Sequence, residues 1–201
     1  MAEFLKPKNT NPRGIPEAPF IEKVDQIIKD GDSDFEPLMS AFQERLQQYK
    51  YMELSKQQQL ADLNVKIPDI EKNLDIIEYL KLKKDSVDND DGDDNNIIET
   101  NYELNDTLYT RASINVNDTN SVYLWLGAQV MLEYPLDEAV ELLKSRLEKN
   151  QQQLTNVKED LQFLKENITT MEVNTARLYN WDVERRKKAK ASSAPPTVKA
   201  S

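Results

Sequence analysis

A long heptad repeat in the C-terminal half constrains the fold of this chain more than any other feature. From Val140 to Leu178, the a and d positions recur at alternating steps of three and four residues, and ten of these twelve positions are apolar. An apolar seam of this period lies on one side of a helix and must be covered by a partner helix. The sequence therefore predicts a coiled-coil arm over residues 136–188.

A second heptad pattern precedes it and predicts the partner arm over residues 34–84. Its seam runs through Phe35, Leu38 and Phe42 and resumes at Leu60 after a local irregularity. Pro68 lies inside the pattern, where the missing N–H and the ring either kink the helix or break it. The same register continues on both sides of Pro68, which favours a kink over a break.

The stretch between the arms, residues 97–135, has the alternating pattern of short β-strands. Residues 108–114, 122–126 and 130–134 alternate in and out, and 97–104 adds a leading strand. The fold class expected is therefore mainly α: a long antiparallel coiled-coil hairpin with a small β-hairpin unit between its two helices.

The predicted β-unit is apolar on both faces of its 122–126 strand and has open edges. Three or four short strands cannot close a core alone, so this unit should pair with other chains. The alternative is that it packs only against the arms of its own chain. The residues expected to serve subunit assembly are Leu108, Tyr109, Ala112, Ile114, Val122, Leu124, Trp125, Leu126, Val130 and Leu132.

The far end of the predicted coil from the β-unit concentrates large apolar side chains. Two antiparallel arms of equal length bring residues near 38 beside residues near 180. The side chains expected there are Phe35, Leu38, Phe42, Leu178, Tyr179 and Trp181. They form either an exposed patch that binds irregular apolar ligands or a plug that closes the coil end and packs a short helix.

Four remaining segments complete the predicted organisation. Residues 1–19, rich in proline, form a flexible lead-in, and residues 20–30 carry the spacing of a short amphipathic helix. Residues 85–96 hold six aspartates and form a disordered acidic loop, because the glycine and glutamate of a calcium-binding loop are out of position. Residues 189–201 form a disordered tail.

Composition excludes most chemistry. Histidine and cysteine are both absent, so the commonest general base, metal ligands and thiol nucleophile are missing, and no enzyme, cofactor or metal site is expected. A net charge of −10 disfavours nucleic acid as a partner. No apolar run approaches the ~20 residues of a membrane span. The expected location is cytoplasmic, and a basic run at 185–188 allows a nuclear fraction.

Several stretches make the chain resemble a known family. They include GIPEAPF at 14–20, LYTRASI at 108–114, VYLWLGAQVMLEYPLDEA at 122–139 and EVNTARLYNWDVERR at 172–186. On these residues the chain resembles the α-type subunits of prefoldin, over residues 14–187. The acidic segment 85–96 is the main departure from the family pattern.

The resemblance implies a hetero-hexamer of two α-type and four β-type subunits. It implies that the hairpins build a platform and that the coil tips capture unfolded actin and tubulin for the cytosolic chaperonin, without ATP. The residues named above would then lie at the platform and at the capturing tip. A different class of function also fits the bare pattern: a structural coiled-coil tether or scaffold whose β-unit is a dimerisation hinge.

Overall fold

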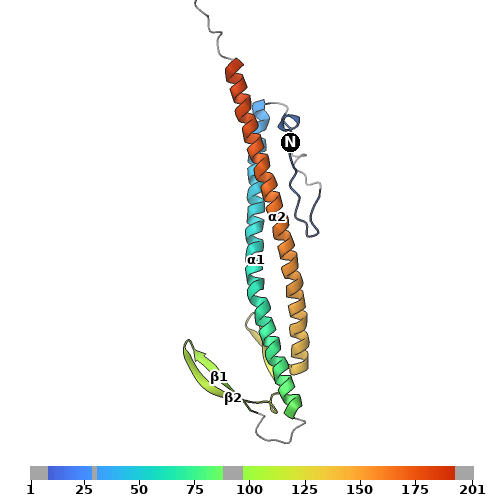
Figure 1. Ribbon diagram of the computed structural model, residues 1–201, viewed down its shortest axis with the longest axis vertical. Helices are drawn as coiled ribbons and strands as arrows, with labels where there is room; N and C mark the ends of the chain where they lie inside the picture. The colour runs from blue at the N-terminus through green and yellow to red at the C-terminus, as the bar shows by residue number, and fades with distance from the viewer. Residues whose placement is uncertain (1–8, 29–30, 88–96, 193–201) are drawn as a thin grey trace, which may run out of the picture. The chain divides into compact units, whose positions relative to one another are not determined.

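Two helices of 57 residues each, separated by two β-hairpins, make up most of the structure (Figure 1). The computed structural model describes residues 9–28, 31–87 and 97–192. Its elements are η1 (Val24–Gln26), α1 (Gly31–Val87), β1 (Ile97–Asn105), β2 (Leu108–Asn115), β3 (Ser121–Gly127), β4 (Val130–Pro135) and α2 (Leu136–Ser192). The predicted fold class, a coiled-coil hairpin with a β-unit between its helices, is confirmed.

The chain divides into two compact units, each containing a piece of both helices. The first unit comprises Met1–Ala61 with Thr155–Ser201, and the second comprises Asp62–Leu154. In both units a cross-helix ion pair marks the antiparallel register of the two helices. Lys50 pairs with Glu172 in the first unit, and Lys144 pairs with Glu78 in the second.

The helix boundaries extend beyond those predicted. Helix α1 runs uninterrupted through Pro68, so the helix does not break there. It continues to Val87, and the rest of the predicted acidic loop lies outside the described residues. Helix α2 continues to Ser192, so residues 189–192 are helical and not part of a disordered tail. The reason is composition, because alanine and lysine are among the best helix formers; residues 193–201 lie outside the described part.

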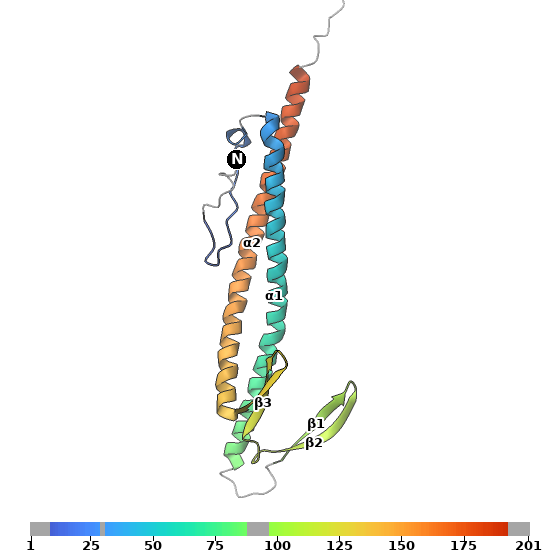
Figure 2. The same cartoon turned by 180° about the vertical axis from the view of Figure 1, so that it is seen from behind.

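In the first unit, the N-terminal segment is a strap that lies along the helices (Figures 1 and 2). We define the strap as residues 9–28. Its apolar side chains join seam residues of α1 and α2 in one core cluster. The buried members from the strap are Ile15, Ala18, Ile21, Val24 and Ile28. The prediction of a flexible lead-in is therefore wrong for residues 9–19.

The amphipathic helix predicted over residues 20–30 is also wrong over its described part. Only the single 3₁₀ turn η1 forms there. The backbone N–H of Ile21 donates to Asn174 Oδ1 at 3.0 Å, and the carbonyl of Pro19 accepts from Asn174 Nδ2 at 2.6 Å. Because α2 supplies these partners, the strap satisfies its backbone without making a helix, and its apolar spacing serves an extended segment.

In the second unit, a smaller core joins both helices to one β-hairpin. Its buried residues are Ile77, Leu136, Ala139, Val140 and Leu143. Side chains of the second hairpin, Val122, Leu124 and Tyr134, pack against this core. One face of β3 and β4 is therefore attached to the coil of its own chain.

The strands form two separate two-stranded antiparallel sheets, β1 with β2 and β3 with β4. The leading strand and the three predicted strands are all present. The β3–β4 turn uses Ala128 and Gln129, both with positive φ. Positive φ at both loop residues suits the right-handed twist of a tight hairpin. Neither sheet has a third strand among the described residues, so each keeps open edges.

Candidate functional site

The apolar residues predicted at the coil end do lie together, but most of them are buried. Phe35, Leu38, Phe42 and Leu178 belong to the core cluster of the first unit, and Trp181 packs against it partly buried. Of the six predicted residues, only Tyr179 is largely exposed, at 60%. The expectation of an exposed patch is thus wrong for the four core residues, because helix-to-helix packing and the strap cover them.

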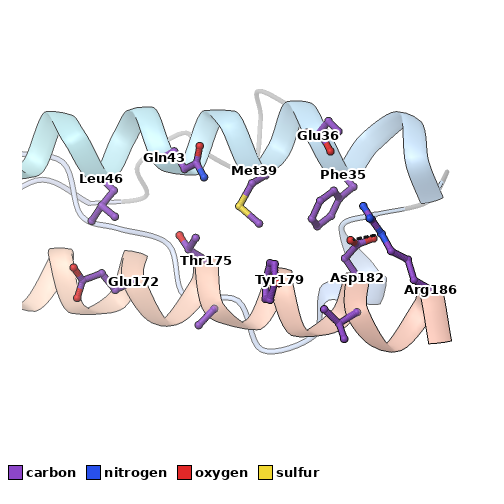
Figure 3. Close-up of a pocket in the computed structure, with 12 residues that line it drawn as sticks. Phe35, Glu36, Met39, Gln43, Leu46, Glu172, Thr175, Tyr179, Asp182 and Arg186 are labelled. Atoms are coloured by element: carbon purple, nitrogen blue, oxygen red, sulfur yellow. Dashed lines mark ion pairs between the residues drawn. The ribbon is translucent and has the colours of Figure 1, made fainter. Parts of the chain in front are cut away.

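An apolar groove remains open beside this core (Figure 3). We call it the coil-end groove; its volume is about 610 Å³. Its apolar lining comes from Phe35, Met39 and Leu46 on α1 and from Ala176, Tyr179 and Val183 on α2. In Figure 3, Met39, Phe35 and Tyr179 converge between the two helices. Among the described residues, none from the strap lines it, so the groove stays accessible while the strap is docked.

The groove has a charged rim that includes one buried acid. Asp182 is buried, and its two carboxylate oxygens are held by Arg185 and Arg186 at 2.9 and 2.7 Å. Burial of a carboxylate is tolerated when cations pair with both of its oxygens. Glu36 and Glu172 line the groove as well. The site therefore combines an apolar floor with charges of both signs, and such a groove suits amphipathic segments better than purely apolar ones.

A second polar centre anchors the N-terminal part of the strap. Asp160 of α2 is fully buried, and it accepts hydrogen bonds from Asn11 and Arg13 of the strap. Lys56 of α1 completes the centre with an ion pair at 3.0 Å. Burial alone raises the pKa of Asp160, but Arg13 and Lys56 outweigh it, so that the pKa lies below its usual value. The carboxylate stays charged at neutral pH and holds strap and helices together.

The hairpins carry the second candidate surface, where most of the predicted assembly residues are exposed. Leu108, Tyr109, Ile114, Trp125, Val130 and Leu132 are all exposed, whereas Ala112, Val122, Leu124 and Leu126 are half-buried. On β3 the pattern alternates: Val122 and Leu124 face the core, and Tyr123 and Trp125 face outward. The outward face of this hairpin and nearly all of β1 and β2 are exposed in the described part of the chain.

Some residues with a place in these sites escaped the sequence reasoning. Met39, Leu46 and Val183 line the coil-end groove, and Tyr123 and Met131 are exposed on the hairpin. Asp160, Asn167 and Asn174 hold the strap. Their spacing of seven residues is a signal that the sequence does contain, since it places all three on one side of α2.

Comparison with known proteins identifies the architecture. A family profile described as "Prefoldin subunit" matches residues 49–181. The chain belongs to the prefoldin subunit family. It is 53% identical to prefoldin subunit 3 of Saccharomyces cerevisiae over 183 residues, which cover 90% of this chain and 89% of the relative. It is 44% identical to the human and mouse proteins of the same name over 176 residues, 87% of this chain and 84–85% of those relatives.

As a member of the prefoldin family, this chain is a chaperone subunit. Members of this family are not enzymes. In the part of the chain that the structure describes, no cluster of carboxylates could hold a metal ion. Neither α1 nor α2, over its described residues, combines the length and apolar character of a membrane span. The two surfaces that remain to be assigned are both suited to contacts with other proteins.

Proposed function

We propose that this chain is an α-type subunit of a hetero-hexamer of two α-type and four β-type subunits that captures unfolded proteins, actin and tubulin among them. The complex passes them to the cytosolic chaperonin without ATP. Its place of action is the cytoplasm, with a nuclear fraction. The observation that carries the proposal is the coil-end groove, which is apolar, open and free of the chain's own strap. The likeness to relatives named prefoldin subunit 3 supports it.

The groove suits an unfolded chain as a ligand for a physical reason. Methionine and other flexible apolar side chains can repack around irregular ligands, and Met39 and Leu46 provide such a lining. The rim charges of Glu36, Glu172 and Arg186 offer partners to polar groups that an unfolded segment brings with it. Binding of this kind needs no nucleotide, because apolar contact and polar contacts at the rim supply its free energy.

Capture can be tested by light scattering of denatured actin diluted into the assembled complex. The groove variant carries Met39→Ser, Tyr179→Ser and Val183→Ser, and we expect it to lose most of the protection against aggregation. Tyr51→Ser is the matched control, since Tyr51 is 75% exposed, lies on α1 in the same unit and does not line the groove. Full protection by the groove variant would show that capture occurs elsewhere.

Assembly through the hairpins is the other half of the proposal. Tyr123 and Trp125 on the outward face of β3, and the open edges of both sheets, provide surfaces for neighbouring subunits. Native mass spectrometry of the complex purified from cells tests the composition. A hetero-hexamer with β-type subunits supports the proposal. A homodimer would instead favour the tether or scaffold, in which the β-unit is a dimerisation hinge and the arms are spacers.

A further inference from the structure

The seat of the strap on α2 is built around three buried polar side chains spaced seven residues apart. Asp160, Asn167 and Asn174 are each no more than 4% exposed. They stand one position before seam residues of the heptad, so they flank the seam on one side of the helix. Buried polar groups are costly unless they are hydrogen-bonded. For Asn167 and Asn174 the strap supplies the partners.

Those partners are main-chain atoms of the strap. The N–H of Ala18 donates to Asn167 Oδ1, and Asn174 accepts from the N–H of Ile21 while donating to the carbonyl of Pro19. Two further side chains donate to strap carbonyls: Arg177 to that of Ile21 at 2.7 Å, and Tyr49 to that of Pro16 at 2.9 Å. Recognition of this kind reads the backbone and is therefore tolerant of sequence.

The apolar side chains that the strap buries are aliphatic and of small or medium size. Ile15, Ala18, Ile21 and Val24 are buried against the core of the first unit, where Phe42, Met171 and Leu178 lie. Over residues 9–28, the strap makes no helix longer than η1 and, apart from an isolated bridge between Thr10 and Pro16, no strand. An extended segment with small or branched apolar residues at similar intervals offers the same main-chain and apolar groups to Asn167, Asn174 and the core, but not the side chains of Asn11 and Arg13 that bind Asp160.

We infer that the strap seat is a second binding site for unfolded polypeptide, which the chain's own strap occupies until a client segment displaces it. The ligand is an extended main chain with aliphatic side chains, bound through Asn167, Asn174 and Arg177. This inference rests on the proposed function and extends it. It adds a second binding site and identifies the strap as the segment that competes for that site. Seam residues such as Phe42 would become available only when the strap leaves.

Competition by a tethered segment sets a threshold for binding. An attached strap has a high effective concentration at its seat, so a client segment must bind tightly or through several sites at once to replace it. The coil-end groove, which is open without any displacement, supplies such a first contact. A folded protein with little apolar surface would bind neither site. It offers no apolar segment to the coil-end groove and no extended backbone to the strap seat.

The strap can be loosened without altering its seat. Ile21→Asp places a charge at a side chain that is 1% exposed, whereas Lys23→Asp places the same charge at an exposed position of the strap two residues further on. The probe is a labelled peptide of the strap sequence, NTNPRGIPEAPFIEKVDQII, added to assembled complexes that contain the full chain. Binding is read by fluorescence anisotropy, and client capture by light scattering of denatured actin.

We expect Ile21→Asp to bind the peptide at least tenfold more tightly than wild type or Lys23→Asp, because a vacated seat removes the competitor. Capture of denatured actin should rise in parallel, and excess peptide should reduce that rise. Adding Asn174→Ala to Ile21→Asp should weaken peptide binding about tenfold or more. Arg13→Gln, which removes the strap's ion pairs with Asp160 and Glu159, serves as a milder loosening and should shift both readouts in the same direction.

Two results would overturn the inference while sparing the proposed function. One is a wild-type complex that protects actin while neither Ile21→Asp nor Arg13→Gln binds peptide or client better than Lys23→Asp. The other is a saturating peptide that leaves client capture by Ile21→Asp unchanged. If no complex, wild type included, protects actin at all, the proposed function itself fails.

Discussion

The coil end and the hairpins both carry more large apolar residues than a two-helix seam needs, yet the structure treats them differently. At the coil end, Phe42 and Leu178 are wholly buried, since the strap covers the seam there. On the hairpin, Trp125 remains 58% exposed, although it lines a pocket with Ile70 of α1 and Arg146 of α2. An excess of apolar residues therefore predicts that another segment packs on them, but not whether that segment belongs to the same chain.

What separates the two regions is the presence of buried polar partners. Beside the coil-end seam, Asn167 and Asn174 hold a strap by its backbone. The exposed face of β3 has alternating aromatic residues and no such clamp. A clamp of this kind secures one segment in one place, whereas an aromatic face with open strand edges suits association between chains.

The largest effect is expected at Phe42, in the covered core of the coil end. We expect Phe42→Ala to lower the free energy of unfolding by about 4 kcal/mol, because it leaves a cavity in the core of the first unit. Tyr51→Ala, at an exposed position of the same helix, should cost less than about 0.5 kcal/mol. Urea denaturation followed by circular dichroism measures both. Equal effects of the two substitutions would mean that the coil end is not covered as described.

The next largest effect should appear in assembly and not in the stability of the chain. Trp125→Ala removes an exposed aromatic anchor from the hairpin, and we expect it to weaken binding to neighbouring subunits by about 3 kcal/mol. Dissociation of the complex on dilution, followed by native mass spectrometry, measures this. The same substitution should leave the unfolding free energy of the chain nearly unchanged. A large loss of stability with intact assembly would reverse the roles given to the two regions.

Periodic parts of the fold could be predicted from the sequence because their signal is local. The heptads from Phe35 and from Val140 mark both helices, and alternation marks the strands. Two antiparallel arms of equal length predict that Leu38 lies near Leu178, and both residues belong to one core cluster. Helix ends were less accurate, since α1 and α2 extend beyond the predicted bounds.

The strap could not be predicted in this way, because its contacts join residues about 150 positions apart. A proline-rich segment has no period of its own, and its backbone partners are side chains of α2 such as Asn174. Of the two alternatives for the predicted tip residues, the plug is the one that agrees with their burial, but an extended strap and not a short helix packs against them. The heptad spacing of Asp160, Asn167 and Asn174 was the only local sign of a seat.

A smaller effect is expected from removing the side chain of Asn174, which holds the strap on α2. Asn174→Ala leaves the N–H of Ile21 and the carbonyl of Pro19 without their partner, which we expect to cost about 2 kcal/mol of strap docking. The Ile21 amide should then exchange with solvent about 30-fold faster, because 1.36 kcal/mol corresponds to a factor of ten. Asn180→Ala, at an exposed position of the same helix, is the control. Unchanged exchange at Ile21 would show that the strap is held by apolar contacts alone.

The smallest effect is the response of the strap to acid. Asp160 faces Asn11 and Arg13 of the strap and Lys56 of α1, with Glu159 beside it on α2 also paired to Arg13. The pKa of Asp160 is lowered in the folded chain, so its contribution to docking is complete above the usual range of an aspartate pKa and is lost as the pH falls through the lower folded value.

We therefore expect the protection of strap amides against hydrogen exchange, corrected for the intrinsic effect of pH, to fall by about 1 kcal/mol below pH 4. Asp160→Asn keeps the shape of the side chain but cannot titrate, so the difference between wild type and this variant isolates the one carboxylate. Strap protection in Asp160→Asn should be lower than wild type at neutral pH and should lose less on acidification. If both lose protection in parallel, other carboxylates control the acid response, and the strap is anchored mainly through Asn167 and Asn174.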